Sequence, residues 1–300
     1  MPSSAALCVL LRVGTALALR AQVGPPSENF HLSMATKWAM ASEVGMKRVV
    51  NMTDVSVNDW WREEGSFKQA PDTSANRTYS MVAPRFHQCA VRFAEDAARS
   101  CGGQACDVVF VGDSITELMN GTVCYNNRHT PMRLSSFIPS PWRAHIIAGG
   151  GDQTQHTLGH LSRCLPRLRT PKLFVLLIGT NNIGPSGRYN TVMTAHGVKA
   201  VARALRVAHP EAKILLHAIL PRYDFDALEI IREANRQLQG WQEPGVQFVD
   251  CGEPFLTKNR TALREMLPDM LHPSFLGYNE WFKCLRPTIA RDLGLPDAMP

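Results

Sequence analysis

Four short segments of this sequence carry residue types that could attack the carbonyl carbon of an ester-like compound and split its bond to the leaving group. Ser114, in Gly-Asp-Ser-Ile, offers a hydroxyl nucleophile. Asp269 and His272 stand three positions apart, so the carboxylate can hold one imidazole N–H while the other ring nitrogen accepts the serine proton. This pattern indicates a nucleophile, a general base and the residue that orients the base.

Two further segments could stabilise the negative charge that such an attack creates. Gly151 ends a run of three glycines, and glycine lets a backbone N–H approach a ligand closely. Asn181 lies in Gly-Thr-Asn-Asn, and its side-chain amide can donate a hydrogen bond. Together with the backbone N–H of Ser114 at the start of a helix, these groups would supply the three donors of an oxyanion hole.

Each of these signals has an ordinary structural explanation when it stands alone. A serine after a strand often caps a helix, turns rich in glycine or asparagine are common, and a histidine before proline is often structural. The combination is less ordinary, because each segment follows a predicted strand and each supplies a different part of one reaction. The ordered combination therefore favours catalysis at Ser114.

The elements that must position these residues alternate between apolar runs and helical patterns. Apolar runs predict strands that are covered on both faces, at 108–111, 145–148, 173–178, 214–216 and 246–249. Helical spacing falls at 86–97, 154–165, 191–208, 226–241 and 278–293. This alternation predicts an α/β fold with three α/β/α layers around a five-stranded parallel sheet in the flavodoxin-like order 2-1-3-4-5. Ligands bind beyond the carboxyl ends of the strands in such sheets, where the four segments lie.

The segments around Ser114, Gly151, Asn181 and His272 resemble the four sequence blocks of the SGNH/GDSL hydrolases. The resemblance covers about residues 82–293 and implies the SGNH hydrolase fold. Within that superfamily the chain is similar to the catalytic (alpha) subunits of the intracellular platelet-activating-factor acetylhydrolases. The stretches that carry this likeness are DVVFVGDSITELM, GGGDQTQHTLGHL, LLIGTNN, AILPR and DMLHPS.

The resemblance implies a role for each site residue. Ser114 would be the nucleophile, His272 the base and Asp269 the residue that orients His272. The Ser114 and Gly151 backbone amides and the Asn181 side chain would form the oxyanion hole. We therefore expect a serine esterase that hydrolyses short-chain esters, acetyl esters in particular, through an acyl-enzyme and without a metal or other cofactor.

Some features limit what the resemblance implies. In the acetylhydrolases an Asn-aromatic-Gly segment leads into the glycine turn, whereas this chain has Ile146-Ile147-Ala148, so we expect a different pocket wall. An acyltransferase would use the same acyl-enzyme, and a non-catalytic binding protein could keep the same scaffold. Catalysis is favoured over binding alone because all five site residues are present.

The composition is that of a globular protein, with 45% hydrophobic and 19% charged residues. The formal net charge is +6, but the basic residues are scattered and do not interleave with aromatic residues. This argues against nucleic acid as a partner. The expected partner is a small-molecule, lipid or glycan ester. No segment beyond the N-terminal stretch predicts an integral membrane span, and the sequence leaves the oligomeric state open.

The N-terminal part of the chain differs from the rest. Residues 1–21 lack acidic side chains and end in small residues, which is typical of a signal peptide or of an organelle transit segment. Residues 22–80 form an irregular extension in which Trp60 and Trp61 are expected to dock on the core. Residues 81–296 are the predicted hydrolase domain.

Glycosylation signals and cysteines favour secretion or the secretory pathway over an organelle or the cytoplasm. The N-x-[ST] pattern, the acceptor for N-linked glycans, occurs at Asn51, Asn76, Asn120 and Asn259. Seven cysteines follow residue 21, so at least one stays a thiol if the others pair. Cys101 and Cys106 flank a glycine-containing loop; they could form a bridge or be ordinary thiols near a turn.

Overall fold

The computed structural model describes residues 84–297, except residues 126, 128, 184–190, 223–226 and 257–263. Its centre is a five-stranded parallel sheet in the order β2-β1-β3-β4-β5. The strands are β1 (Val108–Gly112), β2 (Ala144–Ala148), β3 (Leu173–Leu177), β4 (Lys213–His217) and β5 (Val246–Val249). Each strand lies where an apolar run predicted it, and the predicted strand order is confirmed.

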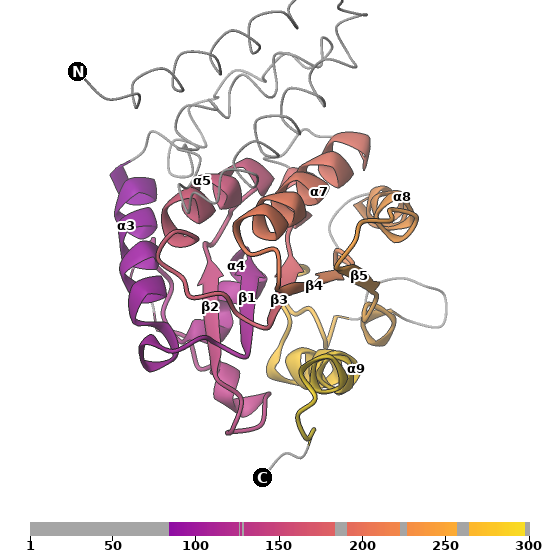
Figure 1. Ribbon diagram of the computed structural model, residues 1–300. Helices are drawn as coiled ribbons and strands as arrows, with labels where there is room; N and C mark the ends of the chain where they lie inside the picture. Colours follow the sequence, from indigo (N-terminus) through magenta and orange to yellow (C-terminus); the bar gives the residue numbers. More distant parts are fainter. Residues whose placement is uncertain are drawn as a thin grey trace, which may run out of the picture. The chain divides into compact units, whose positions relative to one another are not determined.

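Helices cover both faces of the sheet (Figure 1). The helices are α3 (Pro84–Arg99), α4 (Ser114–Glu117), α5 (Thr154–Cys164), α6 (Thr180–Ile183), α7 (Thr191–Ala208), α8 (Ala227–Gln239) and α9 (Phe275–Leu293). α3, α5 and α7 pack on one face, α9 packs on the other, and α8 lies beside α7 and contacts β5. α4 and α6 are single turns that directly follow β1 and β3. The predicted three-layer α/β/α fold is confirmed.

Strand β1 shows how the sheet divides the core into two halves. Val108 and Phe110 pack in the cluster that contains the aromatic side chains of α9. Val109 and Val111 pack in the cluster formed with α3, α5 and α7. Because successive side chains on a strand point to opposite faces, a strand with helices on both sides has to be apolar throughout. This requirement explains the apolar runs of β1 and β3, whose residues are all buried. The expectation of burial on both faces is wrong for β5, which lies at the edge of the sheet, has no buried residue and carries the exposed Gln247.

Six of the seven described cysteines form disulfides. Cys101 and Cys106 are bridged, which settles the alternative that the sequence left open. Two further disulfides connect distant segments: Cys89–Cys124 joins α3 to the segment that follows α4, and Cys251–Cys284 joins the segment that follows β5 to α9. Cys164, on α5, is a buried free thiol, in line with the odd number of cysteines.

The predicted leader at 1–21 and the extension at 22–80, with Trp60 and Trp61, lie outside the described residues. So do the sequons at Asn51, Asn76 and Asn259, whereas Asn120 lies in the described part and is exposed. The boundary at 81–296 stays a prediction. Within the described ranges, none of the helices combines the length and the apolar character needed to cross a membrane.

Candidate active site

The predicted site residues lie at the carboxyl edge of the sheet. The parallel register places the ends of β1, β2 and β3 side by side. Ser114 is the first residue of α4 after β1, Gly151 lies in the turn after β2, and Asn181 lies in α6 after β3. The structure therefore gathers the three segments at one edge, as expected for an open parallel sheet.

His272 connects Ser114 to Asp269. The Nε2 atom of His272 lies 2.8 Å from the Oγ atom of Ser114, and its Nδ1 atom lies 2.6 Å from the Oδ2 atom of Asp269. With its ring proton on Nδ1, His272 donates to the carboxylate, and Nε2 can accept the hydroxyl proton of Ser114. The structure thus brings together the three residues that the sequence suggested, in an arrangement that can activate a serine hydroxyl.

The turn that carries Asp269 and His272 surrounds the carboxylate with donors. The Oδ1 atom of Asp269 accepts hydrogen bonds from the backbone N–H groups of Leu271, at 3.1 Å, and His272, at 2.7 Å. Met270 adopts a φ of 71°, in the left-handed region that non-glycine residues seldom occupy. Partial burial opposes ionisation, but the hydrogen bonds from the His272 backbone and ring outweigh it and hold the pKa of Asp269 below its ordinary value. Asp269 therefore remains a carboxylate beside the imidazole.

The start of α9 connects the base to the nucleophile. Ser274, two residues after His272, caps α9 with its side chain. One turn later the hydroxyl of Tyr278 donates to the backbone carbonyl of Ile115 at 2.6 Å. Because Ile115 follows Ser114 directly, this bond holds α4 against the helix that begins beside His272. The two halves of the Ser114–His272 pair are thus positioned by a common element.

Gly151 lies in a tight turn next to the nucleophile. The backbone N–H of Asp152 donates to the carbonyl of Gly149 at 3.1 Å, and Gly151 has a φ of 79°. A positive φ at the third position of such a turn is the reason that type II turns need glycine there. A Cβ atom placed on Gly150 would lie 3.8 Å from the Cβ atom of Ser114, so the turn passes close to the nucleophile.

Several hydrogen bonds hold the segment that carries Asn181. The Nδ2 atom of Asn181 donates to the backbone carbonyl of Asp152 at 2.9 Å, and the second N–H of this amide can donate to a ligand. Asn182 accepts a hydrogen bond from the first backbone N–H of α5 at 3.0 Å. The buried side chain of Arg222 donates to the carbonyl of Thr180 at 2.8 Å. These bonds connect the turn after β3 to its neighbours on both sides.

Two carboxyl groups are buried around α4. Asp113 caps this helix by accepting from the backbone N–H of Ile115 at 3.0 Å, and Glu117 accepts from that of Cys124 at 2.7 Å. Removal from water raises the pKa of Asp113 and of Glu117 to about 7, and the nearby charge of Asp152 adds to both shifts.

In the described part of the chain, no group of three or more His, Cys, Asp or Glu side chains is placed to hold a metal ion.

Sequence reasoning assigned no role to Asp152, Arg222 and Tyr125, although each contacts a turn at the site. Asp152 and Arg222 stand inside the GGGD and AILPR segments, which was the signal available for them. Tyr125 lies outside every motif, and its contact with Asp152 joins residues 27 positions apart, which no local pattern reveals.

Comparisons with known proteins point to one family. Residues 110–279 match the GDSL-like Lipase/Acylhydrolase family. Over 191 residues the chain is 28% identical to platelet-activating factor acetylhydrolase IB subunit alpha1 of Homo sapiens, covering 62% of this chain and 76% of that protein. Over 187 residues it is 27% identical to the corresponding subunit alpha2 of Gallus gallus, covering 60% of this chain and 73% of that protein.

The fold is also similar to that of solved structures. A GDSL-like lipase from Bacteroides thetaiotaomicron superposes with a TM-score of 0.55 at 20% sequence identity, over 69% of this chain and 97% of that one. This likeness concerns the fold, whereas the family match rests on the sequence of more than half of the 300-residue chain. The chain therefore belongs to the GDSL-like lipase/acylhydrolase family and is a hydrolase that acts on esters.

Proposed function

We propose that this protein hydrolyses short-chain esters, acetyl esters in particular, through an acyl-enzyme formed on Ser114. The observation that carries the proposal is the pair of contacts from Asp269 to His272, at 2.6 Å, and from His272 to the Ser114 hydroxyl, at 2.8 Å. The Gly151 turn and the Asn181 amide at the same edge of the sheet supply the donors that an oxyanion needs.

In the first half of the proposed reaction, the Oγ atom of Ser114 bonds to the ester carbonyl carbon while Nε2 of His272 takes the hydroxyl proton. Asp269 stabilises the imidazolium that forms. The carbonyl oxygen becomes negative and accepts hydrogen bonds from the Ser114 and Gly151 backbone amides and the Asn181 side chain. The intermediate then breaks its bond to the alcohol, which leaves with the proton from His272.

In the second half, water attacks the acyl group on Ser114 and gives a proton to His272. A second tetrahedral intermediate forms at the same donors and collapses, which releases the carboxylic acid and returns the proton to the Ser114 oxygen. Capture of the acyl group by an alcohol instead of water would make the same site an acyltransferase.

Support for a short acyl group comes from the relatives. The proteins of Homo sapiens and Gallus gallus that share more than a quarter of the aligned residues are both named as acetylhydrolase subunits. For the alcohol part of the ester the proposal is broader and includes small molecules, lipids and glycans. The Ile146-Ile147-Ala148 segment, which differs from the Asn-aromatic-Gly segment of the acetylhydrolases, belongs to strand β2. The side chain of Ile147 is buried in the core.

The first prediction concerns the nucleophile. Ser114→Ala should lower kcat/KM for p-nitrophenyl acetate by at least about 1000-fold, because the other site residues cannot form the acyl-enzyme without the hydroxyl. The measurement is steady-state hydrolysis by variants whose circular dichroism spectra match the wild type.

A matched control is Ser162→Ala. Ser162 lies on α5, where its hydroxyl donates to the Gly159 carbonyl of its own helix at 2.7 Å, away from the carboxyl edge. This variant should keep wild-type activity. Equal activity of Ser114→Ala and the wild type would refute the proposed mechanism.

The second prediction concerns the length of the acyl group. The wild type should turn over p-nitrophenyl acetate with a higher kcat/KM than p-nitrophenyl octanoate, by about tenfold or more, because a pocket sized for acetyl excludes six further methylenes. Measurement of both esters under one set of conditions decides this. Faster turnover of the octanoate would contradict the acetyl preference while leaving the esterase mechanism intact.

A further inference from the structure

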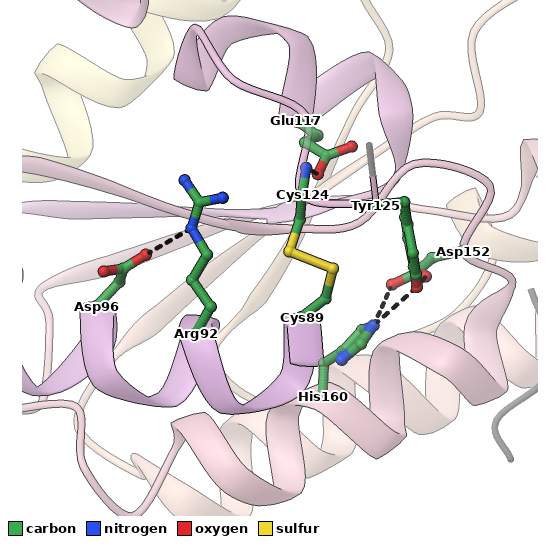
Figure 2. Close-up of a disulfide and its surroundings, with 8 residues drawn as sticks. All are labelled: Cys89, Arg92, Asp96, Glu117, Cys124, Tyr125, Asp152 and His160. Atoms are coloured by element: carbon green, nitrogen blue, oxygen red, sulfur yellow. Dashed lines mark hydrogen bonds and ion pairs between the residues drawn. A yellow bond between two sulfur atoms is a disulfide. The ribbon is translucent and has the colours of Figure 1, made fainter. Parts of the chain in front are cut away.

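Asp152 makes side-chain contacts that the proposed mechanism does not use. Its carboxyl group is buried, the hydroxyl of Tyr125 donates to Oδ1 at 3.0 Å, and Nε2 of His160 lies 3.3 Å from Oδ2 (Figure 2). His160 is itself held between the rings of Phe86 and Phe93, at centroid distances of 4.2 and 5.0 Å. A buried carboxylate is costly without hydrogen bonds. Because Oδ2, the atom next to His160, accepts no hydrogen bond among the described residues, the hydroxyl of Tyr125 is the group whose hydrogen bond favours a single orientation of Asp152.

The backbone of Asp152 contacts both segments that carry oxyanion donors. Its N–H closes the turn on Gly149, and that turn sets the direction of the Gly151 N–H. Its carbonyl accepts the hydrogen bond from the side chain of Asn181 at 2.9 Å. A change in the position of Asp152 would therefore move two of the three proposed donors together.

Tyr125 is held in place through its neighbour Cys124. The disulfide to Cys89 attaches Cys124 to α3, and the backbone N–H of Cys124 donates to Oε1 of Glu117 at 2.7 Å. Glu117 belongs to the helix that starts at the nucleophile, and its Oε2 atom would lie 2.8 Å from a Cβ atom on Gly150. The Cys124–Tyr125 segment is thus anchored beside both α4 and the glycine turn. Figure 2 shows the disulfide from Cys89 to Cys124 and the contact of Cys124 with Glu117.

From these contacts we infer that Asp152 and Tyr125 are positioning residues for the oxyanion hole, and that the Cys89–Cys124 disulfide keeps Tyr125 against Asp152. The inference rests on the proposed function, because it takes Gly151 and Asn181 as the donors. Asp152 and Tyr125 act through those donors. Hydrogen bonds to a developing oxyanion accelerate a reaction when their direction is set before the charge forms, and this is what the two residues secure.

The test is Tyr125→Phe, which removes one hydroxyl and keeps the ring. We expect kcat for p-nitrophenyl acetate, per active site, to fall about tenfold while KM changes little, because a small displacement of a catalytic donor acts on the transition state. Active sites are counted by labelling with a fluorophosphonate to completion. The rate of labelling should fall together with kcat, and a wild-type kcat would overturn the inference.

A second measurement separates positioning from a merely structural role. In an Asn181→Ala background, Tyr125→Phe should cost a smaller factor in kcat than in the wild type, because part of its effect passes through Asn181. A structural role would instead lower the melting temperature and the number of labelled sites and leave kcat per site unchanged. That result would overturn the inference, as would equal factors in both backgrounds.

The disulfide is tested with two matched double variants. Cys89→Ser/Cys124→Ser should lower kcat per active site in the same way as Tyr125→Phe. Cys101→Ser/Cys106→Ser removes a bridge that precedes β1, at the opposite edge of the sheet from the site, and should keep the wild-type kcat per site. Equal losses in both double variants would show a general effect of removing a disulfide and would overturn the role of Cys89–Cys124.

Failure of this inference is distinguishable from failure of the proposed function. If Ser114→Ala is inactive and Tyr125→Phe keeps its kcat, the acyl-enzyme mechanism stands and the positioning role is wrong. If Ser114→Ala keeps its activity, Ser114 is not the nucleophile and the inference is overturned with the mechanism on which it rests.

Discussion

The carboxyl groups near Ser114 respond to their surroundings in opposite ways. Hydrogen bonds from His272 lower the pKa of Asp269, so it is ionised when the base works. Burial raises the pKa of Asp113 to about 7, although its side chain accepts a hydrogen bond from Ile115. A group with a raised folded-state pKa stabilises the folded protein in its protonated form. That stabilisation is complete below pH 3.8, the ordinary pKa of an aspartate side chain, and is lost as the pH rises through 7.

Asp113→Asn should therefore change how stability depends on pH. Asparagine keeps an oxygen that can accept the N–H of Ile115 and carries no charge. Between pH 5 and about 7 the wild type should lose free energy of unfolding relative to this variant, by at most about 1.4 kcal/mol per pH unit. Urea unfolding of both proteins across this range measures the difference.

The comparison between variants is needed because Glu117 is also buried, with a pKa of about 7, and contributes in the same direction in both proteins. The surface variant Asp96→Asn removes a carboxylate of the same type outside the site and controls for the loss of charge. A constant difference between wild type and Asp113→Asn over the whole range would contradict the prediction.

At the level of elements, α5 and α7 pack tightly against each other at Gly197. A Cβ atom on Gly197 would lie 2.3 Å from the Oγ1 atom and 2.9 Å from the Cβ atom of Thr154, the first residue of α5. The Thr154 N–H in turn donates to the side chain of Asn182 in α6, at 3.0 Å. Thr154 therefore takes part both in the packing of α5 on α7 and in the hydrogen bond to the segment that carries Asn181.

Gly197→Ala should destabilise the protein by about 1–3 kcal/mol, because the clash exceeds the gain from the higher helix propensity of alanine. Urea unfolding measures the loss. Gly240→Ala is the matched control, since its nearest contact would be the carbonyl of Arg236 at an ordinary 3.4 Å, and it should change stability by less than about 1 kcal/mol. Similar losses in both variants would argue against a tight crossing at Gly197.

For the molecule as a whole, local patterns predicted the frame of the fold well. The five apolar runs predicted where the strands lie, because a strand buried on both faces has to be apolar. Their order was predicted from the flavodoxin-like topology that a five-stranded parallel sheet favours. The last helix begins at Phe275 and not at 278, because Ser274 supplies a cap that the apolar spacing did not reveal. The predicted Ser114, His272 and Asp269 lie in contact, and their roles stay predictions until the variants are assayed.

Contacts between distant segments were harder to predict. The Tyr125–Asp152 hydrogen bond and the Cys89–Cys124 disulfide join residues 27 and 35 positions apart. Neither pair has a spacing set by a helix or strand period, and disulfide connectivity does not follow from the positions of cysteines. Such pairs depend on how helices and loops pack, which only the three-dimensional structure shows.

The buried thiol of Cys164 has a consequence for the covalent frame. Thiol–disulfide exchange begins when a thiolate attacks a disulfide sulfur, so an internal thiol can scramble the bridges around it. Burial raises the pKa of Cys164 to about 12, which leaves almost no thiolate at neutral pH, and its position in the core blocks access. In the folded state of the described chain, the Cys164 thiol is therefore too poorly ionised and too inaccessible to attack the disulfides. The three bridges can rearrange through Cys164 only after α5 has opened.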